Sequence, residues 1–295
     1  MNKVDIDHLV GKKVGSSTLL KEMARGGMGA VFIAYQDTLK RQIAVKILPK
    51  SIITPTMAQI FQQEAESAAI LAHPNIIQVY EIGDGGDFLY FTMQLVKGKS
   101  LAQYIKMARK NVIPSKRSLP VKTVIEIMID VLNALDYAHS QDIVHRDIKP
   151  GNILIESHTK RPIIADFGLA QVSRNLDETS AMIVGTPMYM APEQIVSPEV
   201  DGRVDIYAAA TMMFEMLTPE PLFLGINSTQ TILKMKMEQN KELFSKKPSD
   251  MNPRLNEEMD QILLKALSFD PETRHATCRE FREKLEQYMG RYLKS

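Results

Sequence analysis

The chain has 295 residues, of which 44% are hydrophobic and 24% charged, a composition typical of a folded globular protein with a sizeable core. The formal net charge of +1 gives no strong field that would favour nucleic acid or an anionic membrane as a partner. The single cysteine, Cys278, excludes an internal disulfide, and no cluster of cysteines and histidines indicates a zinc site.

The sequence shows no membrane or export segment. No apolar run approaches the roughly 18–20 residues that span a bilayer, and residues 1–13 lack the apolar core of a signal peptide. We therefore expect a cytoplasmic chain, with any membrane tether supplied by segments outside it.

The first third of the chain predicts a sheet with one helix. Apolar and polar residues alternate between turn glycines over residues 13–50, which indicates strands. The spacing becomes helical over residues 56–72. Six residues lie near one face of this helix: Ile60, Phe61, Glu64, Ala65, Ala68 and Leu71. Strands return at residues 76–82 and 88–95, with a turn at 83–86 between them.

From about residue 99 the pattern is mostly helical. Residues 121–139 predict a long helix with an apolar stripe, and residues 204–217 a helix that is apolar nearly all round and therefore buried. Thr277 and Glu280 form a capping box that opens a final helix. These elements predict a small sheet-rich lobe and a larger helical lobe, joined near residues 94–98 and separated by a ligand cleft.

A glycine-rich segment containing Gly26, Gly27 and Gly29 lies between two predicted strands. Glycines let the backbone approach a ligand, and free N–H groups there can surround phosphate oxygens. Ordinary hairpin turns have the same composition, so this segment alone leaves both interpretations open.

Lys46 lies in an apolar strand, and Glu64 lies on the apolar face of the predicted helix. A lysine among β-forming residues is usually an outward-facing residue at a sheet edge, and Glu64 alone would be a solvated helix charge. As an ion pair, the two would aim the Lys46 ammonium at phosphate oxygens.

The segment 143–155 places acidic, amide and basic side chains between two apolar runs, as in a rigid loop at a functional site. Asp147 can accept a proton from a hydroxyl group, and Lys149 can neutralise charge on a transferring phosphoryl group. Asn152 offers an amide oxygen to a hard metal ion such as Mg²⁺. Asp166, directly after the next apolar strand, is placed as a second metal ligand.

Together, these motifs resemble the eukaryotic-type protein kinase family. The resemblance covers about residues 15–290 and includes the glycine loop, Ala-Val-Lys, the helix glutamate, His-Arg-Asp-x-Lys-x-x-Asn, Asp-Phe-Gly and Ala-Pro-Glu. The glycine loop and the runs at 73–76, 149–152 and 192–194 are most similar to the bacterial, Hanks-type serine/threonine branch.

The resemblance implies an α+β, bilobal protein-kinase fold with a small antiparallel N-lobe and a larger helical C-lobe. An extension would occupy residues 1–12 and the kinase domain residues 13–290. Within that domain, the N-lobe would span about 13–94, the hinge 94–98 and the C-lobe about 99–290.

The resemblance also implies an ATP site. Gly26 and Gly29 would cover the phosphates, and Lys46 would hold the α- and β-phosphates. Met93 would be the gatekeeper, the backbone of Gln94 and Val96 would bind the adenine edge, and two side chains would enclose the adenine faces. The full predicted set is Met23, Ala24, Gly26, Gly27, Gly29, Val31, Ala44, Lys46, Met93, Gln94, Val96 and Leu154. Ala24 replaces the usual first loop glycine, and we expect it to weaken ATP binding modestly.

In the implied mechanism Asp147 is the catalytic base, assisted by Lys149, Lys46, Glu64 and Thr186. Asn152 and Asp166 would bind Mg²⁺, or Mn²⁺ in its place. Lys149, two residues after the base, resembles serine/threonine kinases, and Thr186 would contact both. The activation loop, residues 169–190, holds Thr179 and Ser180 near the usual autophosphorylation positions, and Arg146 would receive such a phosphate.

Other residues are expected to be structural. Glu193 and Arg274 resemble a buried ion pair of the C-lobe, and Asp205 resembles the aspartate that steadies the catalytic loop. We expect His139 to be a packing residue. The basic stretch 106–120 is either a solvated connection or a docking site for an acidic partner, through Lys106, Arg109 and Lys110.

The functional prediction is an ATP-dependent protein serine/threonine kinase that acts on protein substrates. Alternatives are a nucleotide-binding pseudokinase or scaffold, a small-molecule kinase, and dual specificity that includes tyrosine. The four residues that would separate an enzyme from a pseudokinase are all present: Lys46, Asp147, Asn152 and Asp166. A homodimer that phosphorylates its own chains in trans is a further expectation.

Overall fold

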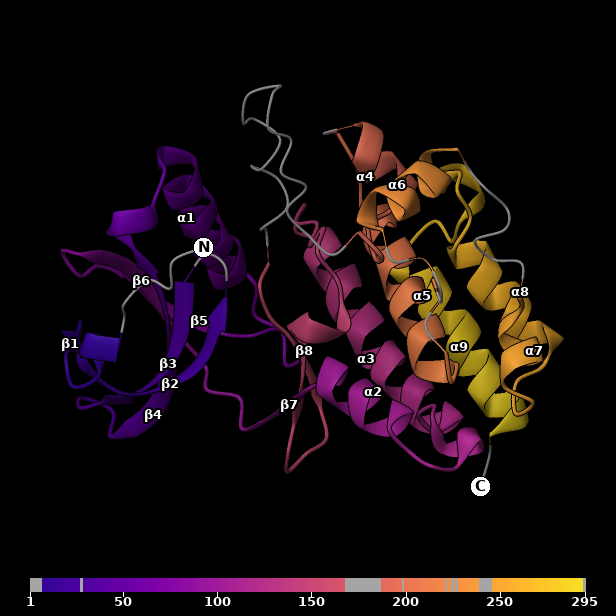
Figure 1. The fold of residues 1–295 in the computed structure, drawn as a ribbon, viewed down its shortest axis with the longest axis horizontal. Helices are drawn as coiled ribbons and strands as arrows, with labels where there is room; N and C mark the ends of the chain where they lie inside the picture. Colours follow the sequence, from indigo (N-terminus) through magenta and orange to yellow (C-terminus); the bar gives the residue numbers. More distant parts are fainter. Residues whose placement is uncertain are drawn as a thin grey trace.

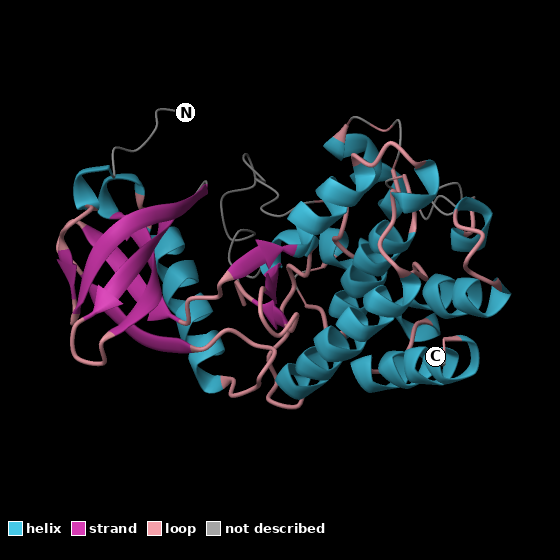
Figure 2. Ribbon diagram, turned by 90° about the horizontal axis from the view of Figure 1, so that it is seen from below, coloured by secondary structure: helices cyan, strands magenta, loops and turns pink. Residues whose placement is uncertain are grey.

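Two lobes of different secondary structure make up the molecule, with strands dominating the first and helices the second (Figures 1 and 2). The computed structural model describes residues 7–26, 29–167, 187–197, 199–220, 222–223, 226, 228–238 and 246–293. Among the described helices, none combines the length and apolar character that crossing a membrane requires.

The N-terminal lobe is built on an antiparallel sheet with strand order β1-β2-β3-β4-β6-β5. Its strands are β1 (Lys13–Val14), β2 (Ser17–Gly26), β3 (Gly29–Gln36), β4 (Arg41–Pro49), β5 (Val79–Asp84) and β6 (Phe88–Met93). The inner strand β4 pairs on both sides, so that Lys46 is opposite Val31 in β3 and Phe91 in β6. This places Lys46 in the interior of the sheet and excludes the sheet-edge interpretation.

Helix α1 (Pro55–Ile70) packs against this sheet near β5. The Thr54 hydroxyl caps its first turn by accepting from the N–H of Met57 at 3.2 Å, and Pro55 occupies the position where no N–H is needed. Glu64 lies on the buried face of α1 and is only 2% exposed. The helix therefore delivers a carboxylate to the inside of the lobe.

The C-terminal lobe is mainly helical, with a small three-stranded sheet facing the N-lobe. That sheet has the order β7-β8-β9, formed by Gly98–Ser100, Ile153–Glu156 and Pro162–Ile164. The α-helices are α2 (Leu101–Arg109), α3 (Val121–His139), α4 (Pro192–Val196), α5 (Arg203–Leu217), α6 (Thr229–Met237), α7 (Pro248–Met251), α8 (Glu257–Ala266) and α9 (Cys278–Tyr292). Short 3₁₀ turns are η1 (Asp7–Leu9), η2 (Lys50–Ile52), η3 (Pro114–Lys116), η4 (Pro150–Asn152) and η6 (Pro271–Thr273).

Helix α5 is the centre of this lobe. Every residue from 204 to 217 is buried, as the all-round apolar pattern predicted, and α3, α8 and α9 pack around it. The bounds of α3 and the Thr277 cap of α9 are confirmed, since the Thr277 hydroxyl accepts from the N–H of Glu280 at 3.1 Å. The carboxylate of Glu280 accepts instead from Ala276, one residue before the cap.

Two predicted boundaries were wrong. The strand predicted at 76–82 begins at Val79, because Ile77 donates its N–H to Ile164 at 2.9 Å and Ile164 donates to Asn75 at 2.8 Å. This short segment therefore joins the two lobes through β9. Residues 106–109 belong to α2 and are not part of a loop.

Candidate active site

The glycine loop forms the hairpin between β2 and β3, with Gly26 opposite Gly29. A Cβ on Gly29 would lie 2.1 Å from the carbonyl oxygen of Ile47, so the sheet itself requires a glycine there. A Cβ on Gly26 would meet only the Gly29 carbonyl oxygen, at 3.9 Å. The fold does not require glycine at position 26, and its open backbone is available to a ligand. Gly27 lies outside the described residues.

Lys46 lies between two carboxylates from different lobes. Its Nζ is 2.5 Å from Glu64 Oε1 and 3.0 Å from Asp166 Oδ1. The predicted pair of strand lysine and helix glutamate is therefore present, and Asp166 extends it across the cleft. The other oxygen of Glu64 is buried without a hydrogen-bond partner among the described residues.

Burial and charge act against each other in this cluster. Burial opposes the charge of Lys46, but the Asp166 and Glu64 carboxylates outweigh it and raise the pKa of the ammonium above its ordinary value. Burial raises the pKa of Glu64 despite the neighbouring lysine. Burial also opposes the ionisation of Asp166, yet Lys46 holds the pKa of Asp166 below its ordinary value. Of the two carboxylates, Asp166 therefore holds its negative charge more firmly.

The catalytic loop is held by Asp205 at the start of α5. The Asp205 carboxylate is fully buried and accepts the N–H groups of His145 and Arg146, both at 2.8 Å. Arg146 has a φ of 64°, a strained conformation for a residue with a side chain. These two hydrogen bonds fix the backbone immediately before Asp147.

Asp147, Lys149 and Asn152 converge on one point of this loop. Lys149 Nζ is 2.6 Å from Asp147 Oδ2. Asn152 Nδ2 donates to the Asp147 backbone oxygen at 2.9 Å and to its carboxylate at 3.1 Å. The carboxylate is thus oriented by a cation and an amide, while the amide oxygen of Asn152 stays available to a ligand.

The segment after β9 packs onto the same loop. His145 Nε2 lies 3.1 Å from the Ala165 carbonyl oxygen, and the His145 ring contacts the fully buried Phe167 ring at 4.5 Å between centroids. Asp166, which lies between Ala165 and Phe167 in the chain, has a φ of 62°. Burial of Phe167 leaves the Asp166 side chain directed to Lys46 in the cleft.

The predicted adenine-binding residues meet at the junction of the lobes. Ala44 is opposite Met93 in the β4–β6 pair, and both are buried. The Gln94 N–H donates to Gln78 at 2.8 Å, so of the Gln94 backbone groups only its carbonyl remains for a ligand. Leu154 is half-buried in β8. In the loop strands, Met23 is 47% exposed and Ala24 is opposite Val31.

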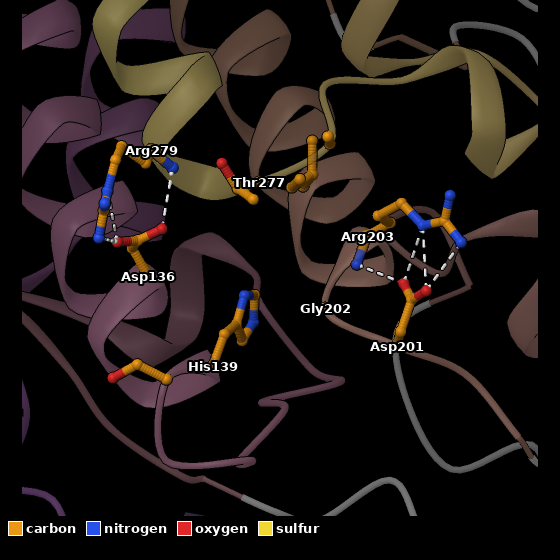
Figure 3. A pocket seen from close by; sticks show the side chains of 10 residues that line it. Asp136, His139, Asp201, Gly202, Arg203, Thr277 and Arg279 are labelled. Atoms are coloured by element: carbon orange, nitrogen blue, oxygen red, sulfur yellow. Dashed lines mark hydrogen bonds and ion pairs between the residues drawn. The ribbon is translucent and has the colours of Figure 1, made fainter.

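Sequence reasoning missed two residues that hold the catalytic machinery. His139, expected to be a packing residue, has Nε2 2.8 Å from Asp205 Oδ2 and so supports the aspartate that fixes the loop. It also lines a pocket of about 590 Å³ behind the loop, together with the ion-paired side chains of Arg203 and Arg279 (Figure 3). Its position at the end of a predicted helix, within an apolar stripe, gave no signal of this contact.

Lys236 in α6 is the second residue that sequence reasoning missed. It is fully buried, and its Nζ lies 2.9, 2.7 and 2.6 Å from the carbonyl oxygens of Pro187, Met188 and Met190. Its position four residues after Ile232 and three after Leu233 places it on the buried face of α6. That spacing was the available signal.

The predicted C-lobe ion pair is confirmed. Arg274 donates to both oxygens of Glu193 at 2.6 and 2.7 Å, and the Arg274 side chain is fully buried. Thr186, and the proposed phosphorylation sites Thr179 and Ser180, lie outside the described residues.

The chemistry of the donors fits a hard divalent cation. Asp166 supplies a firmly ionised carboxylate and Asn152 an amide oxygen, the ligand types that Mg²⁺ prefers. Among the described residues there is no group of three or more His, Cys, Asp or Glu side chains that could hold a metal ion alone. An ion held by these two side chains would take its remaining ligands from substrate phosphates and water.

This arrangement of side chains is found in a chain that matches a known protein family. The family described as "Protein kinase domain" matches residues 17–285. The chain belongs to the protein kinase family. A solved structure of the Mycobacterium tuberculosis PknI kinase domain superposes with a TM-score of 0.74 at 28% identity, covering 95% of this kinase chain and 98% of that one. The prediction of a bilobal α+β kinase fold is confirmed.

Three curated relatives of this kinase are bacterial proteins. A probable serine/threonine-protein kinase of Streptomyces coelicolor is 35% identical over 90% of this chain, and the serine/threonine-protein kinase PknB of Mycobacterium leprae is 33% identical over 88%. The tyrosine-protein kinase MasK of Myxococcus xanthus is 32% identical over 95%. The chain spans 38–44% of the length of these three relatives. The predicted bacterial, Hanks-type branch is confirmed.

Proposed function

We propose that this kinase domain transfers the γ-phosphate of Mg-ATP to serine and threonine hydroxyl groups of proteins. The observation that carries the proposal is the convergence of Lys149 and Asn152 on the Asp147 carboxylate, opposite the Lys46–Asp166 pair. A pseudokinase would not need this oriented base. The Ser/Thr relatives support the choice of hydroxyl group, and MasK, which is named a tyrosine-protein kinase, makes dual specificity the second candidate.

In this proposal each described side chain has one role. Asp147 accepts the proton of the attacking hydroxyl group, and Lys149 neutralises charge that develops on the transferring phosphoryl group. Lys46, oriented by Glu64, binds phosphate oxygens, and the open backbone at Gly26 covers them. Asn152 and Asp166 would hold Mg²⁺, which neutralises phosphate charge when it is bound.

The adenine ring would lie between Ala44 and Leu154, with Met93 as the gatekeeper. The edge of the adenine would bind the Gln94 carbonyl and the Val96 backbone. Activation by phosphorylation of Thr179 or Ser180, in trans within a homodimer, is part of the same proposal. Thr186 would contact the catalytic base Asp147 and Lys149 from the side where the substrate binds.

The test compares Asp147→Asn with Asp142→Asn in a γ-phosphate transfer assay on the protein itself and on peptides. Asn removes the base but keeps its size, so we expect a loss of about 10²–10⁴-fold in rate. Asp142 is an exposed residue with a φ of 58°, a conformation that Asn tolerates, and its variant should keep the wild-type rate.

Phosphoamino-acid analysis of the product identifies the hydroxyl group. Phosphoserine and phosphothreonine alone support the first candidate, and phosphotyrosine in addition supports dual specificity. A folded, nucleotide-binding wild-type protein with no transfer to any acceptor would overturn the proposal in favour of a pseudokinase.

A further inference from the structure

A pocket of about 510 Å³ opens beside the catalytic loop, between α2 and the residues before Asn152. We call it the basic pocket, because basic side chains outnumber acidic ones among its lining residues. The basic ones are Lys106, Arg109, Lys110 and Lys149, and the acidic one is Glu215. Because Lys149 also contacts the Asp147 carboxylate, the basic pocket continues directly into the proposed site of phosphoryl transfer.

The only carboxylate among these lining residues is already neutralised. Arg109 Nη1 lies 2.8 Å from one oxygen of Glu215, and the Tyr189 hydroxyl donates to the other. Glu215 lies in the centre of the lobe on α5 and is 8% exposed. It therefore offers little to a basic side chain of a ligand.

The remaining charge of the basic pocket is positive. Lys106 and Lys110 are exposed and form no ion pair within the part of the chain that the structure describes, and Lys149 shares one contact with Asp147. Cations without acceptors on one wall favour an anionic ligand.

The pocket also has free space next to the loop. A Cβ added to Gly151 would meet no atom within 4 Å, so a ligand side chain can lie against the loop without displacing it. The loop side of the pocket is thus open, and α2 supplies charge from the other side.

The chain's own sequence contains a matching ligand. Asp177 and Glu178 immediately precede Thr179 and Ser180, the residues proposed for autophosphorylation. A substrate segment in extended form advances about 3.3 Å per residue, so an acidic side chain one to three residues from the phosphorylated hydroxyl group remains within about 10 Å of it.

We propose that the basic pocket binds an acidic side chain of the protein substrate, one to three residues from the phosphorylated serine or threonine. This inference rests on the proposed kinase function and adds the substrate class. It narrows the hypothesis of a docking site through Lys106, Arg109 and Lys110, because Arg109 is bound to Glu215 and the exposed charge of this stretch that lines the pocket belongs to Lys106 and Lys110.

The test uses three peptides of residues 175–182: the natural sequence, one with Asp177→Asn and Glu178→Gln, and one with both residues changed to Lys. We expect kcat/KM to fall by about tenfold from the acidic to the neutral peptide, as for one or two favourable charge contacts. It should fall further for the lysine peptide. High salt should reduce the preference, because exposed charges are screened.

Two variants locate the effect. Lys106→Glu combined with Lys110→Glu should remove the preference for the acidic peptide and favour the lysine peptide. Lys116→Glu is the matched control: Lys116 is exposed on η3 and does not line the pocket, so its variant should keep the wild-type ratio. If the double variant does not fold, the salt dependence with the wild-type enzyme decides.

The outcomes separate the two proposals. Equal kcat/KM on all three peptides, from an enzyme that phosphorylates them, would overturn the substrate preference and leave the kinase function intact. Absence of transfer to every peptide and to the protein itself would overturn the kinase function and, with it, the basis of the preference.

Discussion

Two lysines, one partly buried in the N-lobe and one fully buried in the C-lobe, have their charge balanced by different partners. Lys46 lies in β4, with its ammonium between the carboxylates of Glu64 and Asp166. Lys236 lies in α6 and is bound by three backbone carbonyl oxygens, all within 2.9 Å. The aromatic rings of Tyr207 and Phe223 also lie within 5.4 Å of its Nζ.

The partners determine the charge state. Full negative charges raise the pKa of Lys46, although burial opposes them. At Lys236, burial dominates, Arg274 adds repulsion, and the pKa falls to about 7. A charged lysine among carboxylates is ready to bind a ligand phosphate, whereas a lysine among carbonyls holds backbone in place. Burial alone therefore does not distinguish a lysine that binds a ligand from one that holds the backbone.

Among the changes that test this contrast between the two lysines, the largest effect is expected from Lys46→Met. Methionine keeps much of the length of the side chain but removes the charge that would hold phosphates, so we expect kcat to fall by roughly 10²–10³-fold. The measurement is steady-state γ-phosphate transfer with Mg-ATP. The matched control is Lys50→Met, because Lys50 is exposed and forms a surface ion pair with Asp84.

For Lys50→Met we expect kcat within error of the wild type. If Lys46→Met stayed within a few-fold of the wild-type rate, Lys46 would have only the structural role that the comparison assigns to Lys236.

The sequence distinguishes these lysines only in part. Lys46 could be predicted because its partner Glu64 is a side chain, placed on the apolar face of a helix by its spacing. For Lys236 the helical spacing indicates burial but not the partners, because backbone carbonyls are present at every residue and leave no mark in the sequence. The support that His139 gives to Asp205 was missed for a different reason, because it is a side-chain contact between helices far apart in the chain.

Packing also explains which glycines could be interpreted. Gly26 and Gly29 look equivalent in the sequence, yet only Gly29 has a backbone oxygen of β4 where its Cβ would be. The start of β5 was misjudged for a related reason: the apolar residues 76–77 pair with β9, which is more than 80 residues away. Long-range pairing of this kind is outside the reach of local patterns.

The second largest effect is expected from Lys236→Met. It would leave three carbonyl oxygens of residues 187–190 without their donor, and we expect the free energy of unfolding to fall by about 3 kcal/mol. Because this segment directly follows Thr186, KM for the peptide should rise while KM for ATP stays unchanged. Chemical denaturation and two-substrate kinetics measure the two effects.

The control is Lys234→Met on the same helix, where the lysine is exposed and pairs with Glu238 on the surface. We expect neither stability nor KM to change. Equal increases in both KM values for Lys236→Met would show a general loss of structure and remove the positioning role.

The smallest effect is a pH dependence that belongs to Lys236. An unfolded lysine titrates near 10.4, whereas the folded one has a pKa of about 7. Between these values the unfolded state binds more protons, so this group makes the free energy of unfolding rise with pH, by at most about 1.4 kcal/mol per unit. Below pH 7 both states are protonated and the contribution is constant.

Other groups, such as Glu64, titrate in the wild type and in Lys236→Met alike, so the difference between the two proteins isolates Lys236. We expect that difference, measured by urea unfolding between pH 6 and 9, to be flat below 7 and to increase above it. A difference that stayed flat to pH 9 would mean that the three carbonyls hold the proton as firmly as the carboxylates hold it on Lys46, and the contrast between the lysines would then lie in their position alone.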